Sequence, residues 1–111
     1  MISDQLAGGV MDLLVLAVVG HEEAYGYRVA RLLEDSGLQD VSEATVYTSL
    51  RRLESKCLLE SRRELADNGR ARKYYALTAE GVAALGDSAD KWHSLSQSVD
   101  KVLSNFPVKE P

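Results

Sequence analysis

The chain has 111 residues and a mass of 12.2 kDa, enough for one compact domain and too few for two. Its 45% hydrophobic and 27% charged residues are typical of a globular protein, which excludes a disordered tail, a fibrous repeat and a multidomain enzyme. Thirteen basic against seventeen acidic residues give a net charge of −4, which as a total argues against a nucleic-acid partner.

Single residues and motifs exclude further classes. The lone Cys57 cannot form an internal disulfide or a thiolate metal cluster, and its inward helical position makes it either a core residue or a redox sensor. The longest apolar run, Leu13 to Val19, is too short for the roughly 20 residues of a membrane span. His21 and His93 are far apart, and no phosphate loop or metal-ligand spacing is present. We expect a cytoplasmic protein with no enzyme activity, cofactor, metal or membrane partner.

Residues 5–19 have the apolar spacing of a helix, and apolar side chains lie on both of its faces. Such a helix must be covered on two sides, so we expect the rest of the domain on one side and a second subunit on the other. Gly20 predicts the end of this helix. One face carries Leu6, Val10, Leu13, Leu14 and Ala17, and the other carries Met11, Val15 and Val18. Of these, Leu6 and Val10 are expected to lie in the dimer interface.

Two further helices follow, over residues 24–36 and 43–57. Gly37 marks the end of the first, and Ser42 is suited to cap the start of the second. The inward positions are Tyr27, Ala30 and Leu33 in the first helix and Val46, Leu50, Leu53 and Cys57 in the second.

The period then changes to that of strands. Residues 58–65 and 71–77 favour a β-hairpin, because the Asn68-Gly69 pair between them tolerates the positive φ of a tight turn.

Residues 79–106 form the last predicted helix, with Thr78 as its cap and residues 107–111 as a tail. Its apolar residues recur in alternating steps of three and four over about three heptads, which is typical of a coiled-coil seam between two subunits. The seam is Val82, Leu85, Ala89, Trp92, Ser96, Val99, Leu103 and Phe106.

Charge is unevenly distributed along the chain. Residues 1–41 carry a net charge of −5 and residues 77–111 one of −2, whereas residues 42–76 carry +3. Charged residues on a small domain are usually only solvated, but clustered cations attract phosphates whatever the total charge. We call the eight basic residues of this middle segment the basic cluster: Arg51, Arg52, Lys56, Arg62, Arg63, Arg70, Arg72 and Lys73.

Three helices followed by a hairpin are the order of a winged helix-turn-helix, in which the third helix enters the major groove and the hairpin, or wing, reaches the neighbouring backbone. The predicted fold class is mainly α with a small β-hairpin: a winged-helix domain over residues 1–78 and a C-terminal dimerisation helix over residues 79–106. Arg51 and Arg52 can bind phosphates or guanine, and Tyr47 either packs partly against the first or second helix or contacts DNA. The outer face of the third helix carries Thr45, Tyr47, Thr48, Arg51, Arg52 and Ser55.

Three segments stand in a distinctive order and spacing: YGY at residues 25–27, SEATVYTSLRRLE at 42–54 and RKYYALTAEG at 72–81. Together they resemble the PadR family of bacterial transcriptional regulators, and the resemblance covers about residues 6–106. The single helix after the wing is similar to the short-chain branch that includes multidrug-sensing repressors. Thr48 stands where the family often has proline.

The resemblance implies a homodimeric repressor that binds an inverted-repeat operator on double-stranded DNA and dimerises through its first and last helices. In the multidrug-sensing branch an aromatic residue of the last helix lines a hydrophobic pore between subunits. Trp92 is its counterpart, with Ser96 one turn later, so Trp92 either binds a planar hydrophobic effector or anchors the dimer. The resemblance places DNA contacts at Thr45, Tyr47, Thr48 and Arg51 in the third helix and at Arg70, Arg72 and Lys73 in the wing.

A second hypothesis, of another class, keeps the fold and makes the chain a winged-helix module that binds a protein and has no specific DNA site.

Overall fold

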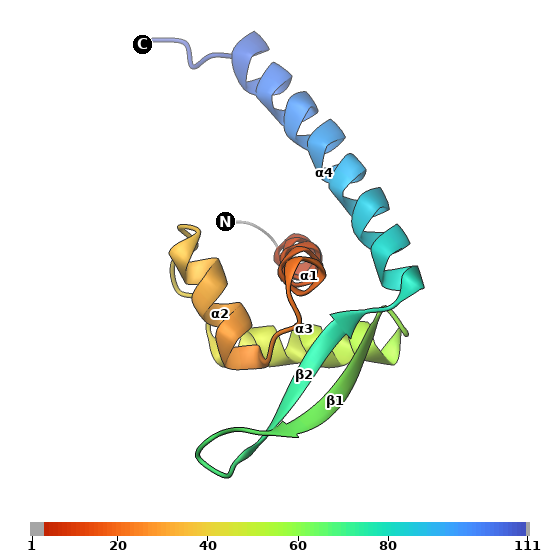
Figure 1. Ribbon diagram of the computed structural model, residues 1–111. Coiled ribbons are helices and arrows are strands. Elements are labelled where there is room, and N and C mark those ends of the chain that lie inside the picture. The colour runs from red at the N-terminus through yellow and green to blue at the C-terminus, as the bar shows by residue number, and fades with distance from the viewer. Residues whose placement is uncertain (1–3, 111) are drawn as a thin grey trace.

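The computed structural model describes residues 4–110, with the side chains from Gly9 onward. The described part is a winged helix-turn-helix with a long C-terminal helix, which confirms the predicted fold class (Figure 1). Its elements are α1 (Asp4–His21), α2 (Gly26–Asp35), α3 (Glu43–Ser55), β1 (Leu59–Leu65), β2 (Ala71–Leu77) and α4 (Ala79–Asn105).

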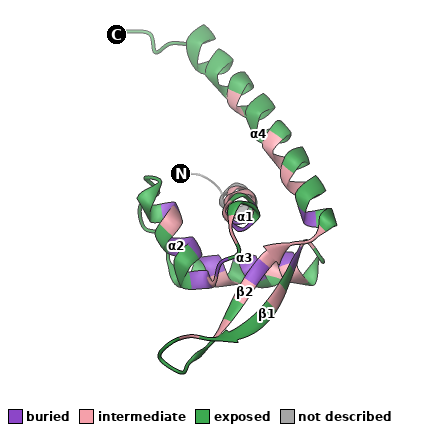
Figure 2. Ribbon diagram, in the orientation of Figure 1, coloured by how far each residue is buried: buried purple, intermediate pink, exposed green. Residues whose placement is uncertain are grey.

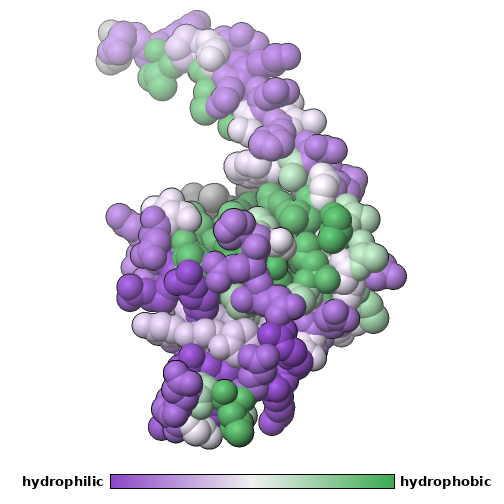
Figure 3. All heavy atoms as spheres, in the orientation of Figure 1, coloured by the Kyte–Doolittle hydropathy of each residue, from purple (hydrophilic) through white to green (hydrophobic). Residues whose placement is uncertain are grey.

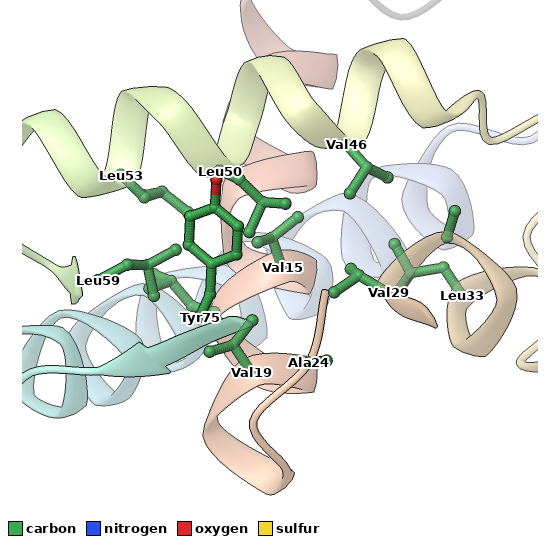
Figure 4. Packing of buried hydrophobic residues seen from close by; sticks show 12 residues of the cluster. Val15, Val19, Ala24, Val29, Leu33, Val46, Leu50, Leu53, Leu59 and Tyr75 are labelled. Carbon is green, nitrogen blue, oxygen red and sulfur yellow. The ribbon is translucent and has the colours of Figure 1, made fainter. Parts of the chain in front are cut away.

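The core lies where α1 packs against α2, α3 and the hairpin (Figure 4). Val15 of α1 and Val46 and Leu50 of α3 are fully buried at its centre. In α2, the inward positions of Ala30 and Leu33 are confirmed, but that of Tyr27 is wrong, because Tyr27 is 48% exposed. The buried core residues are Val15, Leu16, Val19, Ala24, Val29, Ala30, Leu33, Val46, Leu50, Leu53, Leu59 and Tyr75.

Three helix ends form as their local sequences predict. The Ser42 hydroxyl accepts a hydrogen bond from the Thr45 N–H at 3.1 Å and caps α3, and the Thr78 hydroxyl accepts one from the Gly81 N–H at 3.0 Å and caps α4. Gly37 ends α2 with a φ of 101°, a conformation that glycine adopts without strain. These caps fix where α3 begins and where the long helix leaves the hairpin.

Two boundaries around the first loop differ from the expectation. The helix α1 continues through Gly20 and ends at His21, so Gly20 does not stop it. The helix α2 begins at Gly26, two residues later than predicted, because Ala24 is held in extended conformation. Its N–H and carbonyl exchange hydrogen bonds with the backbone of Tyr75 at 3.2 and 2.9 Å. The loop between the first two helices is thereby joined to the edge of the hairpin.

The predicted position of Cys57 inside a helix is wrong. The helix α3 ends at Ser55, and Cys57 is exposed with a φ of 62°. The N–H of Leu58 donates to the carbonyl of Leu53 at 3.0 Å, and that of Cys57 to the carbonyl of Glu54 at 2.9 Å. This pair of bonds closes a helix over a residue of left-handed conformation, so the chain turns toward the wing two residues earlier than expected.

The wing is an antiparallel hairpin whose register runs from Leu59 opposite Leu77 to Leu65 opposite Ala71. At its tip Gly69 has a φ of 82°, which confirms the role expected of the Asn-Gly pair. The wing tip and α4 extend from the body in different directions (Figure 1).

The helix α4 has 27 residues and is therefore about 40 Å long, longer than the body to which its first turns are attached. Leu85 packs against the core, but most of the later residues are exposed (Figure 2). Phe106, at its end, is 77% exposed. The large apolar side chains that α4 and its C-terminal end leave in solvent are Val82, Trp92, Leu95, Val99, Val102, Leu103 and Phe106.

Candidate nucleic-acid interface

The exposed face of α3 carries small hydroxyl groups and one arginine. Thr45, Thr48 and Arg51 are exposed, as the helical period predicts. The Thr48 hydroxyl donates to the carbonyl of Ala44 at 2.9 Å, which leaves its oxygen free to accept from a ligand. This face presents short polar groups near the start of the helix and a cation two turns later, a pattern that suits both phosphate oxygens and base edges.

Tyr47 packs against the start of α2, which is one of the two alternatives that its sequence position left open. A Cβ on Gly26 would lie 2.4 Å from the Tyr47 Cζ, so only glycine leaves room for this ring. Burial, together with the nearby Glu43 carboxylate, raises the pKa of the Tyr47 hydroxyl. Tyr47 therefore joins α3 to α2, and its hydroxyl remains neutral at physiological pH.

The basic cluster divides into paired and unpaired cations. Arg52 pairs with Asp12 of α1, Lys73 with Glu54 at 2.9 Å, and Arg62 with the carboxylates of residues 23 and 64. The other members make no ion pair within residues 9–110. These unpaired cations are Arg51, Lys56, Arg63, Arg70 and Arg72.

Glu54 fixes the wing to α3. Its carboxylate accepts hydrogen bonds from the Ser61 hydroxyl at 2.5 Å and from the Lys73 ammonium at 2.9 Å. The bond from Ser61, followed by that from Lys73, lowers the pKa of Glu54, and the same carboxylate raises the pKa of Lys73. Lys73 thus holds the wing against α3, and its charge is partly neutralised before any ligand binds.

Aromatic rings support the other face of the wing. The Arg72 guanidinium lies 4.3 Å from the centroid of the Tyr25 ring, and the Tyr25 and Tyr74 rings meet edge to face at 5.4 Å. Beside them lies a cleft of about 320 Å³ between α3 and the wing. Its lining residues are Tyr25, Tyr47, Arg63, Ala71, Arg72 and Lys73. Two unpaired arginines and two phenolic groups give this cleft the chemistry of an anion site.

The structure places the DNA-contact residues expected from the sequence on α3 and on the wing, and it brings Tyr47, Arg72 and Lys73 together at the cleft between them. Thr45, Thr48 and Arg51 face solvent on α3, and Arg70 and Arg72 lie on the wing. Three of the expected contacts have partners within the chain: Tyr47 packs against α2, and Lys73 pairs with Glu54. The helical wheel places Arg52 on the outer face, but its guanidinium turns toward Asp12. The expected contacts did not include Arg63 or Tyr25. Arg63 was identifiable from strand alternation, since it shares a hairpin face with Lys73, whereas nothing local indicated that Tyr25 would stack under an arginine.

A second, apolar groove of about 570 Å³ lies between α1, α4 and the loop before α3. Trp92, which is 42% exposed, and Ser96 line it from α4, and Thr45 lines it from the start of α3. Apolar residues gather on the surface between the body and the base of α4, whereas the wing is largely hydrophilic (Figure 3). The remaining lining residues are Val10, Met11, Leu14, Leu38, Gln39, Asp40, Val41, Leu95, Val99 and Asp100.

The residues predicted for the dimer interface differ in exposure. Val82, Trp92, Val99, Leu103 and Phe106 are exposed. Val10, Leu85 and Ala89 are half-buried within the single chain, and the side chain of Leu6 lies outside the described residues. Leu95 and Val102 are exposed beside the predicted seam and widen it.

Two other kinds of site are absent from the described residues. Within this part of the chain no three His, Cys, Asp or Glu side chains are grouped so that they could hold a metal ion. No helix there has the length and apolar character needed to cross a bilayer.

A recognition helix, a wing that carries unpaired arginines and a helix-turn-helix body together define a DNA-binding regulator. Comparison with known proteins identifies which kind. Residues 15–87 match the Transcriptional regulator PadR-like family, and the chain belongs to this family of regulators, which are not enzymes.

Solved structures agree with this assignment. The chain is 36% identical to a PadR family transcriptional regulator from Eggerthella lenta, with a TM-score of 0.80 over 92% of this chain and 88% of that one. It is 31% identical to a PadR-like transcriptional regulator from Bacillus cereus, with a TM-score of 0.78 over 90% of this chain and 97% of that one. It is also 26% identical to an uncharacterised protein of Lysinibacillus sphaericus, over 96% of this chain and 99% of that protein.

Proposed function

We propose that the chain is a homodimeric transcriptional repressor of the bacterial cytoplasm that binds an inverted-repeat operator through α3 and the wing. The observation that carries this proposal is the separation of the basic cluster into paired and unpaired cations. The unpaired arginines are Arg51 on α3 and Arg63, Arg70 and Arg72 on the wing, whereas residues 1–41 and 77–111 are net acidic. DNA phosphates are ligands for which arginines without internal partners are suited.

The exposed side of α4 supports the homodimer. A soluble monomer rarely exposes a long continuous apolar stripe, and the seam from Trp92 to Phe106 lies on a helix that the body does not cover. A second copy, related by a twofold axis, would bury this stripe against an identical one. Two recognition helices related by the same axis would read two half-sites of opposite orientation, which is why the operator is expected to be an inverted repeat.

The apolar groove between α1, α4 and the loop before α3 supports a further part of the proposal, that a small hydrophobic effector controls DNA binding. The groove is large enough for a planar hydrophobic molecule that stacks on the Trp92 ring, and its lining includes Thr45 of the recognition helix. A ligand in the groove would contact both α4 and the start of α3. It would release DNA only if it binds one arrangement of these two helices more tightly than the other. Titration of planar aromatic compounds tests this step: Trp92 emission and operator affinity should both change, and a constant emission and affinity would contradict it.

DNA binding itself is tested with duplexes selected by the protein from a random pool. We expect the wild-type chain to enrich an inverted repeat, and Arg51→Ala to weaken binding to that duplex about tenfold or more, since each well-placed arginine contact contributes about 1–3 kcal/mol. Lys109→Ala, which removes one charge from the C-terminal tail, is the matched control and should bind like the wild type. If no sequence is enriched and a protein partner is captured instead, the chain is a protein-interaction module and the proposal fails.

A further inference from the structure

Among the described residues, a polar cluster joins α1 to α3 beside the apolar core. There Asp12 of α1 faces Ser49 and Arg52 of α3. The Asp12 carboxylate accepts hydrogen bonds from the Ser49 hydroxyl at 2.6 Å and from the Arg52 Nε and Nη2 at 3.0 and 2.5 Å. Ser49 is fully buried, and the Asp12 side chain is only 20% exposed. The Arg52 side chain is 39% exposed, so the pair is shielded from water mainly on its Asp12 side, and its two parallel bonds fix the guanidinium more firmly than a single contact would.

Arg51 and Arg52 are neighbours in the chain but have opposite surroundings. Arg51 is exposed and makes no ion pair with the residues that the structure describes. Arg52 directs two of its nitrogens to Asp12, and the bond to that carboxylate raises the pKa of the guanidinium. One arginine is thus available to DNA, and the next is held by the body of the protein.

We propose that Asp12 is a specificity-determining residue because it withholds Arg52 from DNA. This inference rests on the proposed function. An arginine at the end of the recognition helix, free of its partner, would bind any phosphate within reach and would strengthen binding to all sequences alike. By holding Arg52 against α1, Asp12 limits this sequence-independent attraction. The same contact fixes the rotation of α3 about its axis, so that Thr45, Thr48 and Arg51 keep the outward face.

Asp12→Asn is the substitution that tests the proposal. Asparagine has the same shape and still accepts from Ser49, but it lacks the charge that holds the guanidinium. The probe is a random-sequence duplex of 30 base pairs, with affinity measured as a function of salt concentration. One additional phosphate contact per subunit steepens the slope of log K against log salt by about 0.9 per subunit. We expect this steeper slope for Asp12→Asn, several-fold tighter binding to random DNA at low salt, and a smaller ratio of operator affinity to random-DNA affinity.

Two further variants separate this effect from a general loss of structure or of negative charge. Asp87→Asn breaks the exposed Asp87–Lys91 pair on α4 and changes the net charge by the same amount, so its slope should equal that of the wild type. The double variant Asp12→Asn/Arg52→Gln removes the released arginine and should restore the wild-type slope. A steeper slope that persists in the double variant, or that appears equally in Asp87→Asn, would overturn the proposal.

Arg52→Gln in the wild-type background gives a test that does not depend on how Asp12→Asn folds. If Asp12 withholds Arg52, this substitution leaves the slope of log K against log salt for random DNA unchanged, whereas Arg51→Gln reduces the magnitude of that slope. If both substitutions reduce the magnitude of the slope equally, Arg52 already contacts phosphates in the wild type. This result would overturn the proposal about Asp12 and leave the proposed DNA-binding function intact. A wild-type chain that binds neither the selected nor the random duplex would refute the proposed function as well.

Discussion

Gly81 is the residue of α4 at which the structure predicts the largest effect of one added methyl group. A Cβ at this position would lie 2.0 Å from the backbone oxygen of Leu58 and 3.4 Å from the Cδ2 of Leu77. The Leu58 oxygen cannot move away easily, because it accepts the N–H of Thr78 at 3.1 Å in the joint between the wing and α4. For Gly86, in the same helix, no described atom lies within 4 Å of the Cβ position apart from its chain neighbours and the backbone of its own helix.

These two glycines predict opposite effects of the same substitution. In an open helix, Gly→Ala adds about 1 kcal/mol of stability through helix propensity, and this is the change expected for Gly86→Ala. At Gly81 the added carbon falls more than 1 Å inside normal contact distance of a backbone atom, so overpacking costs about 3 kcal/mol and outweighs the gain. The net loss is about 2 kcal/mol, and the two variants should differ by about 3 kcal/mol in free energy of unfolding.

Urea unfolding at one fixed protein concentration measures both values, since the stability of the proposed dimer would depend on concentration. In thermal unfolding the loss at Gly81 corresponds to a fall in Tm of roughly 10 °C for a domain of this size. If Gly81→Ala is as stable as Gly86→Ala, then α4 does not leave the wing in the close contact described above, and the reasoning is refuted.

Three further changes test the parts of the site. Gly26→Ala should displace the Tyr47 ring, which can swing aside. A gel shift should therefore show weaker operator binding, and urea unfolding should show a smaller loss of unfolding free energy than for Gly81→Ala. Unchanged operator binding would contradict this. The pKa of Glu54 is lower in the folded protein than its ordinary value of 4.5. The hydrogen bonds of its carboxylate therefore stabilise the fold at pH values above 4.5, and this stabilisation is lost as the pH falls through the lowered pKa. Thermal unfolding should therefore find Glu54→Gln less stable than the wild type at pH 7, with a difference that shrinks as the pH falls below 4.5, whereas a difference that stays constant into acid would exclude this role. Leu103→Ser should raise the dimer dissociation constant at least about tenfold in sedimentation experiments, and an unchanged constant would place the seam outside the interface.

The parts of the fold that local sequence determines were predictable. The caps at Ser42 and Thr78, the end of α2 at Gly37 and the turn at Gly69 each depend on residues within a few positions. The start of α2 was not predictable in this way, because Ala24 is held by hydrogen bonds to a strand fifty residues further along the chain. Local periodicity also continued α3 through Cys57, where backbone bonds close the helix instead.

The same distinction applies to the candidate site. Helical period correctly placed Thr45, Thr48 and Arg51 on the exposed face of α3. It gave Arg52 the same role, because Asp12, the residue that holds it, lies forty positions earlier. A basic residue is less available to DNA when it forms an ion pair with an acidic residue of the protein. Where that acidic residue is distant in sequence, only the folded structure shows the pair.

The salt dependence of operator binding tests the central claim most directly. The wing arginines Arg63 and Arg70 are exposed and make no ion pair with the described residues, so each should bind a phosphate in both subunits. The double variant Arg63→Gln/Arg70→Gln should therefore reduce the magnitude of the slope of log K against log salt by about 3.6, from four lost contacts at about 0.9 each. A slope equal to that of the wild type would show that Arg63 and Arg70 do not bind DNA phosphates, which contradicts the claim that the unpaired cations of the wing form the DNA surface.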